Sequence, residues 1–175
     1  MIRIIIISFV FTLLFVGCKN ENSGKVEYHL PDWSNRQVKK KKIDTLRIGK
    51  TYLPVYAQIY EMSEERRVDL AATISIRNTD VKDTLFLSKI NYYDTEGKLI
   101  RSYINTPVFV RPAETLEIII KTSDNEGGSG ANFIFAWHIS KNASTPLFEA
   151  VMISTSGQQG ISFTCRGVEL KQNTE

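Results

Sequence analysis

From residue 51 onwards, apolar residues alternate with polar residues at a period of two, and turn-forming residues interrupt the alternation at short intervals. The segment 68–76 shows the pattern cleanly, because every second residue in it is apolar: Val68, Leu70, Ala72, Ile74 and Ile76. Such alternation is typical of strands that bury one face. We therefore expect strands along most of this part of the chain.

The same pattern predicts eight strands, at residues 52–59, 68–77, 84–93, 98–109, 115–122, 131–139, 147–155 and 160–166. Pro107 marks an edge or a bend within its strand, since proline cannot donate to a sheet. No segment shows the period of a long amphipathic helix, although residues 62–67 could form one helical turn. Regular short strands of this kind predict an all-β fold, an immunoglobulin-like antiparallel β-sandwich of about eight strands.

The N-terminus carries a different pattern. Arg3 precedes the uncharged run Ile4–Val16, which as a helix would span roughly 20 Å, less than the ~30 Å hydrocarbon core of a bilayer. The run therefore resembles the hydrophobic part of a signal peptide, and Gly17–Cys18 at its end resembles the lipobox of bacterial lipoproteins. An uncleaved short anchor with an incidental cysteine is the alternative interpretation.

These features divide the chain into three parts. We expect a lipoprotein signal peptide at 1–17, a lipidated Cys18 with a flexible basic tether at 18–42, and the β-sandwich domain at 43–175. Residues 19–42 hold seven Lys or Arg against three Asp or Glu, whereas residues 43–175 hold 14 against 16. Because the basic charge lies outside the domain, the composition argues against nucleic-acid binding.

Lipidation of Cys18 would place the protein at a membrane. Two or more acyl chains on one residue give stable anchoring where a single chain does not. We therefore expect a cell-envelope protein held in the membrane through Cys18, and Lys19 favours the outer membrane where two membranes exist. The expected role is that of a binding or structural module, with an envelope protein or another ligand as partner.

Candidate chemistry in the domain is sparse. Cys165 alternates with Ile161 and Phe163 on one strand face, which is typical of a small buried hydrophobe. The domain has a single histidine, His138, and a single cysteine, so we expect no zinc site, no cofactor and no catalytic residue.

The order of the strands predicts at which end of the sandwich each connecting loop lies. If every connection reverses the chain direction, the loops 78–83, 111–114 and 140–146 share a near end with the tether. The loops 60–67, 94–97, 123–130 and 156–159 then meet at the far end, which points away from the membrane. Loops on a rigid sandwich often carry binding residues. We therefore expect ligand contacts at the far end, through Asp94, Asp124, Gly127, Gly128, Ser129 and Asn132.

Two alternatives remain open for the same loops. Asp94 with Asp124 or Glu126 could form the carboxylate pair of a hydrolase, provided that their pKa values are pushed apart. Acidic side chains of these loops and of loop 78–83 could instead bind calcium, although no EF-hand spacing is present. The candidates are Asp80, Asp83, Asp94, Glu96, Asp124 and Glu126.

Several segments resemble one family of bacterial proteins. The segments are YLPVYAQIY (52–60), TISIRNTD (73–80), YYDTEGKLI (92–100), GGSGANFIFAW (127–137) and EAVMISTSGQQGISF (149–163). They are similar to the family catalogued as domain of unknown function 3124. The resemblance implies no activity, and it agrees with a signal peptide or lipid anchor and an envelope location.

Overall fold

The computed structural model describes residues 30–39, 43–156 and 159–171. The expected signal peptide and the expected lipid anchor at Cys18 therefore lie outside the described residues. Within the described ranges, no helix is long and apolar enough to cross a membrane.

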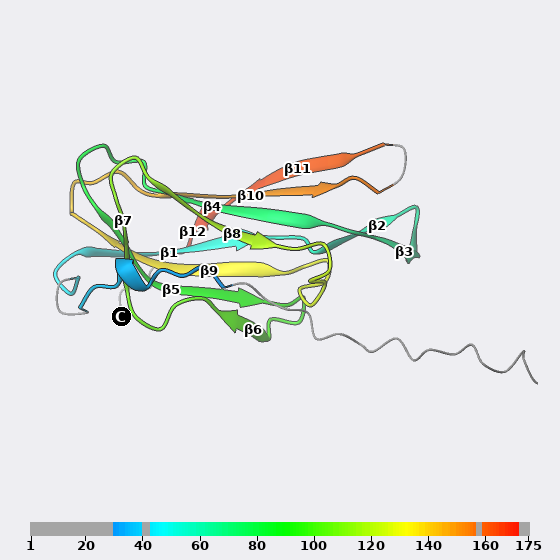
Figure 1. Ribbon diagram of the computed structural model, residues 1–175, viewed down its shortest axis with the longest axis horizontal. Helices are drawn as coiled ribbons and strands as arrows, with labels where there is room; N and C mark the ends of the chain where they lie inside the picture. The colour runs from blue at the N-terminus through cyan, green and yellow to red at the C-terminus, as the bar shows by residue number, and fades with distance from the viewer. Residues whose placement is uncertain (1–29, 40–42, 157–158, 172–175) are drawn as a thin grey trace, which may run out of the picture.

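Two antiparallel sheets pack face to face (Figure 1). The first has the order β12-β1-β9-β5-β6, with β7 also paired to β5, and the second has the order β11-β10-β4-β8. The strands of the first sheet are β1 (Arg47–Pro54), β5 (Leu85–Tyr93), β6 (Leu99–Ser102), β7 (Val108–Val110), β9 (Asn132–Ile139) and β12 (Val168–Glu169). Those of the second sheet are β4 (Ala71–Arg77), β8 (Thr115–Ile120), β10 (Leu147–Ser154) and β11 (Ile161–Arg166). The predicted all-β sandwich is confirmed.

The core lies between the two sheets and follows the alternation in the sequence. In β9, Phe133, Phe135 and Trp137 are fully buried, and the ring of Phe135 stacks on Phe148 of the opposite sheet at 4.4 Å between centroids. Each such side chain contributes roughly 1.5–3 kcal/mol when it is fully buried. In β4, the inward positions Ile74 and Ile76 are equally buried. Alternation thus identified the strand faces correctly.

Two predicted strands are each divided. The expected strand 52–59 is β1 followed, after a break at 55–57, by β2 (Gln58–Glu61), and the expected strand 98–109 is β6 and β7. In both places the chain changes partner: β2 leaves the main sheet, and β6 and β7 pair with different parts of β5.

The segment 62–67 is not a helical turn. Residues Ser63–Asp69 form β3, which pairs with β2 as a separate hairpin projecting at one end of the molecule (Figure 1). Its side chains are almost all exposed, so no apolar alternation marked it as a strand.

Residues 30–39 lie against the domain, whereas the sequence predicted a flexible tether here. They contain the 3-10 helix η2 (Ser34–Arg36) and a β-bridge from Gln37 to Val108. The backbone N–H of Val38 also donates to the carbonyl of Pro107 at 2.8 Å. This stretch, which we call the N-terminal strap, therefore covers the edge at β7.

Candidate functional site

The far-end loops lie together, as the reversal of successive strands predicted. The hydroxyl of Thr95 donates to the carbonyl of Gly127 at 3.1 Å and accepts from the N–H of Gly130 at 3.0 Å, which joins loop 94–97 to loop 123–130. The carbonyl of Gly128 accepts from Ala57 at 3.0 Å, just before the β2–β3 hairpin. Asp94 and Asp124 therefore belong to the same end of the sandwich.

The near-end loops also lie together. The carboxylate of Asp80 accepts the backbone N–H of Ser144 at 2.9 Å, and its carbonyl accepts that of Ala113 at 2.9 Å. It further accepts the N–H groups of Lys82 and Asp83. These bonds, from Asp83 first and then from Ser144 and Lys82, lower the pKa of Asp80 to about 2. Asp80 thus connects all three near-end loops.

Asp94 stabilises its own turn. Its Oδ1 accepts the backbone N–H groups of Glu96 at 3.1 Å and of Lys98 at 2.8 Å. Gly97 in the same turn has φ of 80°, a conformation that favours glycine. The carboxylate therefore has a structural role in closing the β5–β6 connection.

Asp124 is buried against Arg101. The Nη1–Oδ2 distance is 2.9 Å, and the two side chains are only 11% and 4% exposed. Arg101 also reaches Glu126 at 3.4 Å and the hydroxyl of Tyr103 at 3.2 Å. Burial is the largest single influence on Arg101 and lowers its pKa, but the hydrogen bonds to Asp124 and Tyr103 and the charge interactions with both act together to raise it. Arg101 therefore stays charged, and its contacts with Asp124 and Glu126 fix the 121–126 segment to β6.

The glycine loop is shaped by its neighbours. A side chain at position 127 would collide with the hydroxyl of Tyr92, a residue that is fully buried. Burial first, and the nearby Asp124 second, raise the pKa of Tyr92. Gly128 has φ of 68°, a backbone conformation that favours glycine. Gly127 is therefore required by the space beside Tyr92, and Gly128 by its backbone conformation.

The two remaining predicted residues, Asn132 and Ser129, lie in a strand and in a loop, respectively. Asn132 opens β9 and pairs with Pro54 on one side and Tyr93 on the other. Ser129 is partly exposed in the loop. The predicted set is thus brought to one end, and most of its members hold the loops in place.

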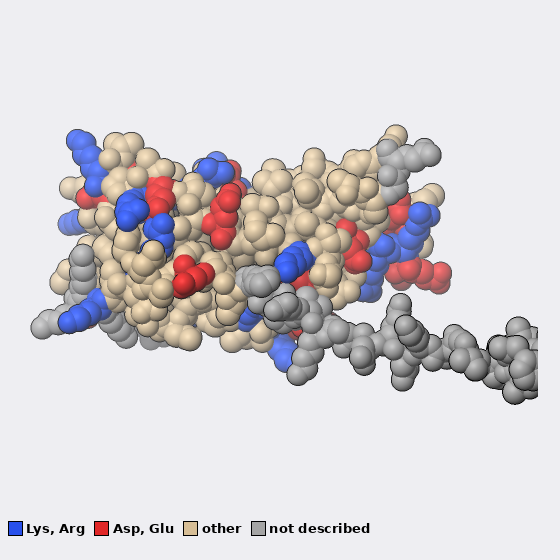
Figure 2. Space-filling view, in the orientation of Figure 1, with Lys and Arg blue, Asp and Glu red and all other residues tan. Residues whose placement is uncertain are grey.

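The sequence did not reveal a groove at the same end. It lies between the β2–β3 hairpin and the β10–β11 turn, with a volume of about 440 Å³. Its lining residues are Glu61, Arg66, Arg67, Val68, Asp69, Thr122, Ser156, Gln159 and Ile161. Figure 2 shows charges of both signs side by side where the hairpin projects. The charged run 64–67 could have indicated this groove, but the sequence did not show which residues lie opposite the run.

Charged side chains of the hairpin contact one another and an aromatic ring. Arg66 pairs with Glu61 at 2.8 Å, and the guanidinium of Arg67 lies 5.0 Å from the ring centroid of Tyr60. Met62 at the tip is 92% exposed and has φ of 65°, which is unusual for a residue with a side chain. The hairpin therefore presents an apolar tip above a charged stem.

His138 pairs with a residue that the sequence did not single out. Its Nε2 lies 2.9 Å from the hydroxyl of Ser88 on the neighbouring strand β5. Burial lowers the pKa of His138, so the imidazole is neutral near pH 7. Ser88 lies at an irregularity of β5, between Leu87 and Lys89. The Ser88 hydroxyl thus satisfies Nε2 of a largely buried ring, whereas the buried Nδ1 has no hydrogen-bond partner among the described residues.

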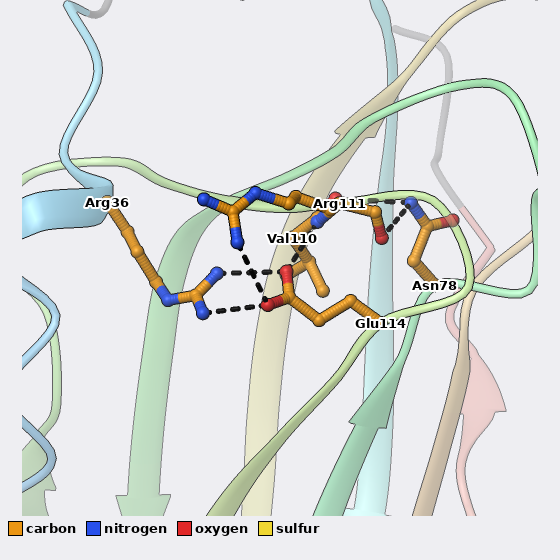
Figure 3. A network of polar contacts seen from close by, with 5 residues as sticks. All are labelled: Arg36, Asn78, Val110, Arg111 and Glu114. Atoms are coloured by element: carbon orange, nitrogen blue, oxygen red, sulfur yellow. Dashed lines mark hydrogen bonds and ion pairs between the residues drawn. The ribbon is translucent and has the colours of Figure 1, made fainter.

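A second polar network lies at the near end (Figure 3). The guanidinium of Arg36 binds both carboxylate oxygens of Glu114, at 2.9 and 2.7 Å. These hydrogen bonds lower the pKa of Glu114. The amide of Asn78 donates to the carbonyls of Val110 and Arg111 at 3.1 and 3.0 Å. The network joins the strap to the β7–β8 turn.

The carboxylates named for a hydrolase or a calcium site have other partners. Asp94 accepts backbone N–H groups, and Asp124 and Glu126 both pair with Arg101. Among the described residues, no group of three or more His, Cys, Asp or Glu is placed to hold a metal ion. Burial raises the pKa of the half-buried Cys165 thiol, which lowers its reactivity.

The fold and these two ends define a class of protein: a single antiparallel β-sandwich with structured loops at both ends. Residues 48–170 match the family model described as "Protein of unknown function (DUF3124)". The chain belongs to that family, and the resemblance noted in the sequence is confirmed.

No curated protein matches the sequence. The chain is similar to a solved structure described as "Crystal Structure of Thermotoga maritima 1070", with 11% identity and a TM-score of 0.41. That similarity covers 69% of this chain and 92% of the other.

Proposed function

We propose that this protein is an envelope lipoprotein, anchored through Cys18, whose sandwich domain binds a partner at the far end. The anchor is supported by the sequence alone: Arg3, the apolar run Ile4–Val16, and Gly17 directly before the cysteine. Acylation of Cys18 would hold the domain at a membrane surface.

The groove beside the β2–β3 hairpin supports the binding role. It combines the two arginines Arg66 and Arg67 with acidic side chains and the apolar Val68 and Ile161. Concave sites with a few convergent polar groups are typical of binding surfaces. The exposed Met62 extends the same surface beyond the groove.

The anchor is tested by Cys18→Ser. We expect the variant protein to leave the membrane fraction or to accumulate as an unprocessed precursor, as measured by fractionation and intact mass. Mature, membrane-bound protein in the variant would show that the anchor is not at Cys18.

The binding surface is tested with a photo-crosslinking amino acid placed at Met62 in intact cells. Val81 in the near-end loop 78–83 is the matched control, because it is also an exposed apolar residue, at 74% against 92%. We expect a discrete crosslinked species from position 62 and none from position 81. Equal adducts at both positions, or none at either, would contradict a far-end binding surface.

A further inference from the structure

A second concave site lies under the N-terminal strap, away from the far end. It has a volume of about 210 Å³ and forms where residues 31–37 lie against the β6–β7 connection. Its lining residues are Pro31, Asp32, Trp33, Ser34, Gln37, Tyr103, Ile104, Asn105, Thr106 and Val108. One side of the pocket is formed by the strap and the other by residues 103–108, so the pocket exists only where the strap lies against the sandwich.

One part of this pocket is apolar and aromatic. Tyr103 is 8% exposed and belongs to the core, and Trp33 and Ile104 pack against that core while remaining partly exposed. A ligand here would therefore meet ring and aliphatic surfaces held by the sandwich itself.

The rest of the lining offers hydrogen-bonding groups that the described residues leave unused. The side chains of Gln37, Asn105 and Thr106 line the pocket and make no hydrogen bond with any described residue. Asp32 accepts the backbone N–H of Ser34 through Oδ1 at 3.0 Å, and its carboxylate lines the pocket. Amides and hydroxyls both donate and accept, so the pocket can satisfy a ligand that does the same.

Charge and size restrict the ligand. Among the described residues that line the pocket, Asp32 is the only charged one, so none of them carries a positive charge that would bind an anion. A volume of about 210 Å³ is below the range of about 300–1,000 Å³ that holds drug-sized ligands. The described lining thus fits a small ligand that carries no negative charge and is rich in groups that both donate and accept hydrogen bonds.

We propose that this pocket binds a single ring of a neutral saccharide. A sugar ring has a face of C–H groups that can lie on an aromatic side chain, here Trp33, and a rim of hydroxyls. The rim would meet the amides of Gln37 and Asn105 and the carboxylate of Asp32. The inference concerns a different surface from the groove beside the β2–β3 hairpin and does not depend on it.

The test uses the full-length protein in a detergent without a sugar headgroup and a panel of neutral methyl glycosides. The chain has two tryptophans, and Trp137 is fully buried, so a saturable change in tryptophan fluorescence reports on Trp33. We expect weak binding, because so small a ligand makes few contacts. Saturation-transfer NMR on the same glycosides measures binding independently of fluorescence.

Two variants and one control make the test specific. Asn105→Ala should weaken binding by roughly tenfold, the loss expected for one or two hydrogen bonds. Trp33→Phe should abolish the fluorescence change while NMR still detects binding, because an aromatic ring remains. Asn142→Ala, an exposed asparagine outside the pocket, should change neither readout.

Three results would overturn the proposal. They are the absence of a saturable response to any glycoside, equal affinity in Asn105→Ala and wild type, and a response only to charged compounds such as small amines or phosphate. Gln37→Ala provides a second variant with the same expected direction should Asn105→Ala fail to fold.

Discussion

Gly49 and Trp137 are cross-strand partners in β1 and β9, and the indole ring occupies the space where a side chain at position 49 would lie. The indole N–H donates to the hydroxyl of Thr51 at 3.0 Å, again across the same pair of strands. Gly49 therefore leaves the space that the ring of Trp137, the largest buried side chain of the core, occupies. Thr51, two residues later, accepts the hydrogen bond of that ring. The centre of the first sheet depends on this local arrangement.

Gly49→Ala should therefore destabilise the domain by about 1–3 kcal/mol or more, because the added methyl group forces the buried ring of Trp137 to move. Urea unfolding followed by tryptophan fluorescence measures the change. Gly160→Ala is the control, since a Cβ there would make only an ordinary contact of 3.5 Å with the carbonyl of Ser154. Equal stability of the two variants would contradict the role assigned to Gly49.

Arg101→Met should destabilise the domain by about 3–5 kcal/mol, because it leaves the carboxylate of Asp124 buried without its partner. The double variant Arg101→Met with Asp124→Leu should recover much of the loss, since no buried charge then remains. Denaturant unfolding of the wild type, both single variants and the double variant gives the coupling energy. If the free energy of unfolding of the double variant falls by the sum of the two single losses, the two side chains are not coupled.

Stability at low pH should depend on Asp80. Its pKa is lowered to about 2 by three backbone N–H groups, below the ordinary value of 3.8. The folded state therefore gains stability from this group above the ordinary pKa, and the gain is lost as the pH falls through about 2. Asp80→Asn should be less stable than the wild type at neutral pH, and the difference should shrink between pH 4 and pH 2. A difference independent of pH would contradict the assignment.

Glu114→Gln should loosen the N-terminal strap while the sandwich remains folded. The half-buried pair with Arg36 is replaced by a weaker neutral contact, at a cost of about 1 kcal/mol or less. Hydrogen exchange of the Val38 N–H, which is bonded to Pro107, should become faster. The same exchange rate in wild type and variant would show that the ion pair does not hold the strap. Glu117→Gln, in the exposed face of β8, is the matched control.

Alternation in the sequence predicted the strands that have one buried face. Ile74 and Phe135 lie inward as expected, because burial imposes a period of two on β4 and β9. The same argument failed for β3, whose side chains are exposed on both faces, and for β12, where Val168 and Glu169 are both exposed. A strand that buries no face leaves no such signal.

The candidate site was predictable in position and not in detail. Reversal of successive strands placed Asp94 near the glycine loop, and the Thr95–Gly127 contact agrees with it. The pairing of Arg101 with Asp124 was not predictable, since it depends on how β6 lies relative to a loop 23 residues later in the chain. The strap was missed for a similar reason: its contacts with Glu114 and Val108 join residues remote in sequence.

The strap also determines where mechanical load enters the domain. Tension along the chain from the N-terminal side would meet the Arg36–Glu114 pair and the Gln37–Val108 bridge before it reached Arg47, the first residue of β1. Both contacts lie on the peripheral strand β7 and its turn, while β1 lies between β9 and β12 inside the sheet. A pull on the N-terminus would therefore be resisted first by contacts at the margin of the sandwich. The strap contacts would therefore have to break before such a pull could act on the central strand β1.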